Sequence, residues 1–352
     1  MISAVIIPIV NDSTAQHAAT GDDFYSLAGW VCQYYGREPI QIDPLPQEAS
    51  HRRFFRAVGS TGTYIAMLSP PHLENNEDFL RLGRFFHSQN IPVPIIHAED
   101  LERGFFLLED FGTVHVAEAY ESGAQEPALR CAINVLRRLQ TVATKDIPPY
   151  SRQRFTDEFD LFHTWLVAGL LQQAWTPALL ERINRERDQL LSDIVRQPQT
   201  VVHRDYHCRN LLWRDAQIGV IDFQDALTGP ALYDLASLLH DCYWVHDTST
   251  VDAGLKAFLH QHPLFSGIDF NQAKRWLEAT AIQRQVKAVG IFARLYLRDG
   301  KATHLRHISP VLKQIQRLVA GRAELPALSA TLHQLQHRVA ARLEQLTSDL
   351  PA

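Results

Sequence analysis

One stretch of the sequence, residues 201–212, constrains the fold and the chemistry of the chain more than any other. It consists of the apolar pair Val201-Val202, a polar loop of eight residues and the apolar pair Leu211-Leu212. A turn then returns the chain through residues 218–221, whose β-branched side chains suit a strand. We expect this loop and hairpin to present two carboxylates and one amide at a common edge, namely those of Asp205, Asn210 and Asp222.

These three side chains suit phosphoryl transfer. Two carboxylates and an amide that face one space can hold a hard divalent cation such as magnesium and leave one carboxylate as a base. The reaction needs a carboxylate that orients the attacking hydroxyl and a metal that neutralises the phosphates. The alternative is a polar surface turn. The flanking apolar pairs, together with Asp222 on a strand twelve residues after Asn210, favour the catalytic interpretation.

Length and composition bound the remaining possibilities. A chain of 352 residues, 46% hydrophobic and 21% charged, is typical of a globular protein with two lobes. The net charge of −5 and the lack of a basic block argue against a nucleic-acid partner. No segment reaches the ~18 apolar residues of a membrane helix, and the four cysteines lack metal or redox spacing. We therefore expect a cytoplasmic monomer with reduced thiols, preceded by a disordered leader or edge strand at residues 1–20.

The periodicity of apolar residues divides the chain into a small strand-rich lobe, residues 21–111, and a helix-rich lobe, residues 112–352. In the first lobe it predicts helices at 22–36 and 76–89, strands at 52–58, 63–69, 93–97 and 105–109, and a connection at 39–46. In the second it predicts helices at 114–120, 126–144, 154–173, 177–196, 234–244, 251–260, 271–297, 309–320 and 326–346.

The central loop resembles that of the aminoglycoside phosphotransferase family, which has the protein-kinase-like fold. That family has the loop His-x-Asp-x-x-x-x-Asn followed by Ile-Asp-Phe/Trp-x-x-Asp at a strand end, and this sequence contains both patterns. The resemblance implies an α+β fold with a small antiparallel-sheet lobe and a large helical lobe. It implies that Asp205 is the catalytic base, that Asn210 and Asp222 bind Mg²⁺, and that the phosphoryl donor is ATP. His203 would organise the loop.

The resemblance also assigns Asp234 and Asp225. Asp234 stands where the family has an aspartate at a helix start that braces the catalytic loop, although it could equally be a simple helix cap. Asp225 would assist near the substrate. A second tripeptide, Asp110-Phe111-Gly112, matches the metal motif of protein kinases but precedes the catalytic loop, whereas the kinase motif follows it. We assign residues 107–112 to the strand and hinge between the lobes, where Glu109 and the backbone would bind the nucleotide.

The first lobe departs from the kinase pattern because it contains no lysine; the first lysine of the chain is Lys145. Met67 stands near the position where kinases have a lysine that binds the nucleotide phosphates. Arginine would then have to bind the phosphates, and Arg52, Arg53 and Arg56 flank the hairpin turn. Strand alternation places Arg53 on the face opposite the other two. A solvated edge strand that deters aggregation is the alternative explanation of these arginines.

Softer motifs narrow the resemblance to bacterial anomeric kinases of cell-wall amino sugars. These motifs are Ser-His-Arg-Arg-Phe-Phe-Arg at 50–56, Leu-Ser-Pro-Pro at 68–71, Gly-Ile-Phe-Ala-Arg-Leu at 290–295 and Arg-Asp-Gly-Lys at 298–301. Such enzymes phosphorylate the C1 hydroxyl of N-acetylmuramate and N-acetylglucosamine in peptidoglycan recycling. The resemblance therefore implies a small sugar and a nucleotide as the partners of this chain.

The acceptor site is less well defined by the sequence. Residues 157–165 place acids and aromatic rings on one helix, where Glu158 and Trp165 could border a sugar pocket or belong to the surface and the core. Four arginines could bind an acidic substituent of the acceptor: Arg204, Arg209, Arg294 and Arg298. Two other functions stay open at this stage. One is a kinase of another small alcohol, such as choline, homoserine or an aminoglycoside; the other is a nucleotide-binding regulator without activity.

Overall fold

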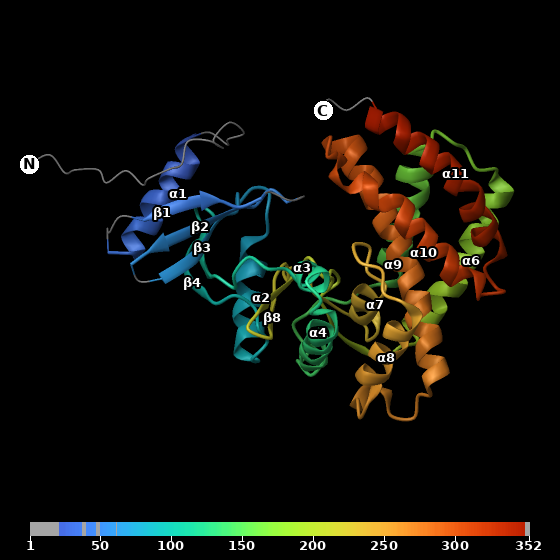
Figure 1. Ribbon diagram of the computed structural model, residues 1–352, viewed down its shortest axis with the longest axis horizontal. Coiled ribbons are helices and arrows are strands. Elements are labelled where there is room, and N and C mark those ends of the chain that lie inside the picture. The colour runs from blue at the N-terminus through green and yellow to red at the C-terminus, as the bar shows by residue number, and fades with distance from the viewer. Residues whose placement is uncertain (1–20, 37–39, 47–49, 61, 349–352) are drawn as a thin grey trace, which may run out of the picture. The chain divides into compact units, whose positions relative to one another are not determined.

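The computed structural model describes residues 21–36, 40–46, 50–60 and 62–348, and within it the chain divides into two compact units (Figure 1). Unit 1 runs up to Thr113 and also takes Leu212–Asp215 and Gly219–Gln224, and unit 2 contains the remainder. The predicted boundary at residue 111 did not anticipate that parts of the central hairpin belong to unit 1. The predicted leader, residues 1–20, lies outside the described residues.

Unit 1 is built on a five-stranded antiparallel sheet of order β1-β2-β3-β5-β4. Its strands are β1 (Gln41–Pro44), β2 (Arg53–Gly59), β3 (Gly62–Leu68), β4 (Ile96–Asp100) and β5 (Phe105–Glu109). The predictions of β2, β3 and β5 are confirmed. Two predictions were wrong: β1 replaces the expected connection at 39–46, and β4 begins at Ile96 because Pro92 and Pro94 cannot donate to a ladder.

Two helices cover opposite faces of this sheet because successive residues of a strand point to opposite sides. Helix α1 (Gly21–Tyr34) packs its buried Leu27 and Val31 in one core with Phe105 and Leu107 of β5. Helix α2 (Asn76–Ser88) lies on the other face, where the ring of Phe79 meets that of Phe106 at a centroid distance of 5.3 Å.

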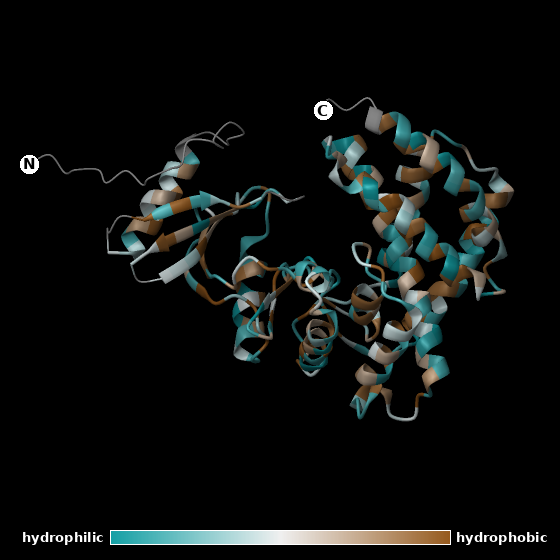
Figure 2. Ribbon diagram, in the orientation of Figure 1, coloured by the Kyte–Doolittle hydropathy of each residue, from teal (hydrophilic) through white to brown (hydrophobic). Residues whose placement is uncertain are grey.

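Unit 2 is mostly helical, and its helices are banded in hydropathy as expected for amphipathic elements (Figure 2). They are α3 (Val116–Glu121), α4 (Gln125–Leu139), α5 (Arg152–Leu161), a π-helix at Phe162–Leu170, α6 (Pro177–Val195), α7 (Tyr233–Leu239), α8 (Thr248–Leu259), α9 (Phe270–Asp299), α10 (Ile308–Ala320) and α11 (Pro326–Ser348). Short 3₁₀ turns occupy Pro263–Phe265 and Ala302–His307. Strands β6 (Gln199–Val202) and β9 (Leu227–Pro230) pair antiparallel, and the central hairpin consists of β7 (Leu211–Arg214) and β8 (Gln217–Val220).

Three differences from the predicted elements concern the neighbourhood of the central loop. The helix expected at 154–173 is divided into α5 and the π-helix, and β9 was not predicted. The helix expected at 234–244 ends at Leu239, because the buried carboxylate of Asp241 accepts a hydrogen bond from the backbone nitrogen of Tyr243 at 2.8 Å. Asp241 thereby offers this backbone group an alternative to the helix.

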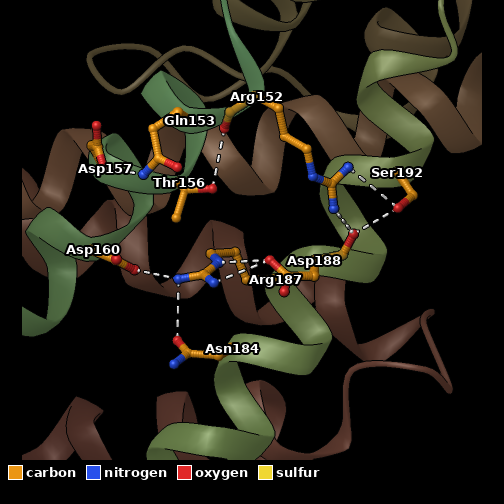
Figure 3. A network of polar contacts seen from close by, with 9 residues as sticks. All are labelled: Arg152, Gln153, Thr156, Asp157, Asp160, Asn184, Arg187, Asp188 and Ser192. Carbon is orange, nitrogen blue, oxygen red and sulfur yellow. Dashed lines mark hydrogen bonds and ion pairs between the residues drawn. The ribbon is translucent and has the colours of Figure 1, made fainter.

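Helix α9 is the centre of unit 2, with α5, α6, α7, α10 and the π-helix in contact with it. A polar network fixes α5 to α6 beside it (Figure 3). Arg152 donates to the backbone oxygen of Asp188 at 2.8 Å, and Arg187 pairs with Asp160 at 2.8 Å. Helix α5, which this network joins to α6, also contacts α9. Among the described helices, none is both long and apolar enough to cross a membrane.

Candidate active site

The loop at residues 203–210 is held by two buried aspartates. The carboxylate of Asp234 accepts hydrogen bonds from the backbone nitrogens of His203 and Arg204, at 2.6 and 2.9 Å. The carboxylate of Asp241 accepts one from the backbone nitrogen of Cys208 at 2.8 Å. Asp234 is not the N-cap of α7, because that position is Leu232. Its contacts are with the backbone of the loop, as the family resemblance implies.

Two residues next to the predicted chemistry adopt backbone conformations that are uncommon for side chains with a Cβ. Arg204 has φ 80° and Asp222 has φ 63°. Such conformations persist only where the surroundings impose them, and they concentrate at functional sites. At Arg204 the imposing group is Asp234, which binds the backbone nitrogen of this residue. At Asp222 the constraint comes from the next residue, Phe223, whose ring stacks on that of Phe79 within unit 1 at a centroid distance of 5.2 Å.

Asp205 lines a pocket whose lining residues all belong to unit 2. The pocket has a cavity volume of about 100 Å³ and is open to solvent on one side. Loop residues, the segment after α7 and one face of α9 form its wall: Asp205, His207, Cys242, Tyr243, Arg284, Lys287, Ala288, Ile291 and Phe292. The wall thus combines the carboxylate of Asp205 with the basic side chains of Arg284 and Lys287 and the aromatic rings of Tyr243 and Phe292.

The cations of α9 keep Asp205 ionised. Burial alone would raise the pKa of this carboxyl, but the positive charges of Lys287, His207 and Arg284 hold it well below its usual range, and Arg204 acts in the same direction. A carboxylate with a low pKa is a weak proton acceptor. Asp205 is therefore better suited to orienting a hydroxyl group by a hydrogen bond than to removing its proton early.

Beneath this pocket, Glu158 of α5 binds the cations. Its carboxylate contacts Arg204 at 2.9 Å and Lys287 at 3.2 Å, and it accepts a hydrogen bond from the hydroxyl of Tyr150. Burial raises the pKa of Glu158, but the cations and the tyrosine lower it more, so its carboxyl is ionised. Glu158 was predicted to touch the substrate. The structure gives it partners within the protein and only 8% exposure.

Asn210 and Asp222 supply oxygen donors of the kind that magnesium prefers. The amide nitrogen of the buried Asn210 donates to the backbone oxygen of Asp205 at 3.0 Å, which directs the amide oxygen away from that carbonyl. The carboxylate of the exposed Asp222 accepts a hydrogen bond from Gln224 at 2.7 Å. These side chains fit the predicted metal. Asn210 belongs to unit 2 and Asp222 to unit 1, so a site shared by both stays a prediction.

The three arginines of the phosphate hairpin have different surroundings in unit 1. Arg52 is buried and lies 3.5 Å from Glu74, whereas Arg56 binds Asp110 through two contacts of 2.7 and 3.1 Å. Arg53 is half-buried, and burial lowers its pKa. Met67 of β3 is fully buried, consistent with a lysine-free strand. Which arginine binds phosphate stays a prediction.

The tripeptide at 110–112 has a structural role at the end of β5. Besides binding Arg56, the Asp110 carboxylate accepts a hydrogen bond from the backbone nitrogen of Gly112 at 2.8 Å. The ring of Phe111 packs so closely on Gly219 that a Cβ there would lie 2.3 Å from it. The carboxylate of Glu109 accepts from the backbone nitrogen of Ile95 at 3.2 Å, and nucleotide binding by Glu109 stays a prediction.

The remaining candidates for acceptor binding are distributed along unit 2. Asp225 lies 3.7 Å from Arg204, and Trp165 packs against the core from the π-helix. Arg294 is half-buried on α9, while Arg298 is exposed and paired with Asp299 at 2.6 Å. Arg209 alone of the four predicted arginines stacks on a residue of the pocket wall, Tyr243.

The sequence analysis missed the cations of α9, Arg284 and Lys287, and the second loop brace, Asp241. A signal for the first two was present in the sequence. Residues 280–287 carry five polar side chains in the middle of a long predicted helix, and Arg284 and Lys287 are separated by one helical turn. Polar residues in a buried helix have partners or a function, because burying them otherwise is unfavourable.

Comparisons with known proteins agree with this geometry. Residues 41–270 match the model of the phosphotransferase enzyme family, APH. An N-acetylmuramate/N-acetylglucosamine kinase of Neisseria meningitidis is 34% identical over 321 residues, which cover 88% of this chain and 95% of the relative. A protein of the same name from Pseudomonas putida is 33% identical over 294 residues, which cover 82% of this chain and 86% of the relative.

A solved structure, the ethanolamine kinase Pv091845 of Plasmodium vivax, is similar in fold. The TM-score is 0.65 at 13% sequence identity, and the match covers 89% of this chain and 93% of that one. At this identity the likeness concerns the fold alone.

Proposed function

Because this chain belongs to the phosphotransferase enzyme family, we propose that it is a kinase that uses ATP and magnesium to phosphorylate an amino sugar. The acceptor is the anomeric hydroxyl of N-acetylmuramate or N-acetylglucosamine. The relatives with these substrates in their names are similar over most of the chain, which supports the assignment.

The pocket around Asp205 is the observation that carries the choice of acceptor. Arg284 and Lys287 line it, so a cationic acceptor would be repelled close to the reacting group. Ethanolamine, named in the structural neighbour, is such a cation. N-acetylation removes the ammonium charge of an amino sugar, and N-acetylmuramate is an anion. Tyr243 and Phe292 offer the aromatic surfaces on which sugar rings pack.

In this proposal the protein acts mainly by positioning. Asp205, kept ionised by its neighbours, accepts a hydrogen bond from the acceptor hydroxyl and aims its oxygen at the phosphorus, and it takes the proton as the new bond forms. Magnesium, when bound by Asn210 and Asp222, would neutralise the charge of the nucleotide phosphates. Arg52, Arg53 and Arg56 are the candidates for phosphate binding in unit 1.

An assay by phosphorus NMR tests the proposed function directly. The protein is incubated with ATP, magnesium and either sugar, and we expect a new phosphate doublet coupled to the anomeric proton. Turnover of choline, ethanolamine or an aminoglycoside with neither sugar consumed would overturn the proposal.

Replacing the catalytic carboxylate tests the mechanism. We expect Asp205→Ala to lower kcat by about 10³-fold or more, since it removes the group that orients the hydroxyl. Asp215→Ala serves as control, because Asp215 is 87% exposed in the turn between β7 and β8. Turnover by Asp205→Ala close to that of the control would contradict the assigned role.

A further inference from the structure

Arg209 occupies a fixed place beside the acceptor pocket. Its guanidinium carbon lies 3.9 Å from the centroid of the Tyr243 ring, a close cation–π contact. Tyr243 is part of the wall that also contains Asp205. The backbone on either side is fixed as well, because His115 contacts the carbonyl oxygen of Arg209 at 2.6 Å and Asp241 binds the nitrogen of Cys208. The guanidinium is thus pre-organised next to the place where an acceptor would bind.

Two of the other three predicted arginines are paired with a carboxylate, whereas Arg209 has no such pair among the described side chains. Arg204 is paired with Glu158, and Arg298 is paired with Asp299. Among the described side chains of residues 23–36, 40–46, 50–60 and 62–346, no carboxylate forms an ion pair with Arg209 within 4 Å.

The side-chain partner of Arg209 is an imidazole. His307 Nε2 lies 3.3 Å from a terminal nitrogen of Arg209. Burial lowers the pKa of His307 to about 4, and the charge of Arg209 contributes to this shift, so the imidazole is neutral near pH 7. It can accept a hydrogen bond but cannot balance the charge of the guanidinium.

We propose that Arg209 binds a carboxylate of the acceptor and thereby makes the enzyme favour N-acetylmuramate over N-acetylglucosamine. This inference rests on the proposed function. The two sugars differ in a lactyl ether, which carries the carboxylate in N-acetylmuramate and is absent from N-acetylglucosamine. The planar fork of arginine forms two parallel hydrogen bonds with such a group, and stacking on Tyr243 reduces the entropy lost on binding.

The same cation chemistry would also suit a phosphate of the nucleotide. Arg209 directly precedes Asn210, which makes this the competing source of an anion. The position of the guanidinium on Tyr243, in the wall of the acceptor pocket, favours the acceptor. The two sources predict different kinetics, because loss of a nucleotide contact affects every acceptor equally.

The test compares Arg209→Gln with the unaltered protein on three acceptors: N-acetylmuramate, its methyl ester and N-acetylglucosamine. We expect kcat/KM for N-acetylmuramate to fall about 10- to 100-fold more than for the other two, mainly through KM, as for the loss of a charged hydrogen bond. Arg209→Lys keeps the charge but not the planar fork, so its kcat/KM for N-acetylmuramate should lie between those of Arg209→Gln and the unaltered protein. Arg185→Gln is the matched control, since Arg185 on α6 is 69% exposed and paired with Glu181, and it should leave the preference as it is.

Three outcomes would overturn the inference. Equal losses on all acceptors with a raised KM for ATP would assign Arg209 to the nucleotide. An unaltered preference in Arg209→Gln would show that the carboxylate is bound elsewhere. If the unaltered protein neither binds nor phosphorylates either sugar, the proposed function itself fails, an outcome that the first measurement separates from the other two.

Discussion

Glu158 balances the charges beneath the acceptor pocket. It is the carboxylate shared by Arg204 and Lys287, both of which are less than a tenth exposed. Arg204 belongs to the catalytic loop and Lys287 to the pocket wall, so one buried acid links the loop to α9. A buried charge without a partner is strongly destabilising. We therefore expect the contact between the loop and α9 to need both the carboxylate of Glu158 and the two cations.

We expect Glu158→Gln to lower the free energy of unfolding by about 3–5 kcal/mol, because it removes the nearest counter-charge of two buried cations. Urea unfolding measures the loss. The double variant Glu158→Gln/Lys287→Met should lose less than the single one, since it removes one of the two cations. Glu181→Gln serves as control and should change stability by less than about 0.5 kcal/mol, because Glu181 is 71% exposed. A single variant as stable as this control would contradict the balancing role.

At the residue scale, the sequence was informative where a functional residue stands in a fixed local pattern. Asp205, Asn210 and Asp222 were chosen from the spacing of one loop and one strand, and the structure places Asp205 in a pocket wall. Lys287 and Arg284 could not be assigned in this way. The polar stretch at 280–287 marks them as unusual, but their place in the pocket depends on where α9 passes the loop, and this long-range contact is not visible in the local sequence.

Among the elements, α9 depends on one glycine for its approach to α5. A Cβ at Gly290 would lie 2.5 Å from the backbone carbon of Leu161 and 2.7 Å from the nitrogen of Phe162, at the junction of α5 with the π-helix. Real Cβ atoms do not come so close to backbone, so the two helices would have to separate. Lys287 lies one turn earlier on α9 and meets Glu158 one turn before the junction. The glycine therefore maintains the contact that supplies the cation of the pocket.

We expect Gly290→Ala to lower the free energy of unfolding by about 1–3 kcal/mol and to reduce kcat as well, since overpacking moves α9 away from α5. Thermal unfolding and steady-state kinetics measure both effects. The matched control is Gly29→Ala in α1, where a Cβ meets nothing within 4 Å. Helix propensity should make this control about 0.5–1 kcal/mol more stable. Stabilisation of both variants to the same extent would show that the close approach is not needed.

Element types were more predictable than element ends. Long amphipathic patterns such as those of α4 and α6 predicted the helices because apolar residues recur on one face. The π-helix after Leu161 and the early end of α7 were not predictable. The first depends on the close packing at Gly290, and the second on hydrogen bonds of Asp241 to a distant loop.

At the scale of the whole molecule, the predicted protein-kinase-like fold and the family resemblance are confirmed by the matches to known proteins. The loop at residues 203–210 carried the family resemblance because its pattern of residues is specific. The membership of the hairpin in unit 1 was not foreseen. It follows from Phe223, which stacks on Phe79 of α2, a pairing of residues far apart in the sequence.

The stability of the whole chain should fall in mild acid because several histidines are held neutral. Burial lowers the pKa of His240, His262 and His307 to about 4 each. The case of His262 is clearest from geometry. Its ring lies between Phe258 and Phe265, and its Nδ1 accepts a hydrogen bond from the backbone nitrogen of Leu264 at 3.4 Å, which a protonated ring cannot do.

The direction of this change in stability with pH follows from proton binding. Between pH 6.5 and 4 the unfolded chain takes up a proton at His262 that the folded chain does not, so stability is complete above about pH 6.5 and declines as the pH falls. At pH 5 this one histidine should cost about 2 kcal/mol. In His262→Asn the amide oxygen can still cap Leu264 without titrating, and we expect a smaller decline in the urea midpoint between pH 7.5 and 5. His337→Asn, at an exposed position of α11, should keep the full decline, and an equal decline in both variants would contradict the role of His262.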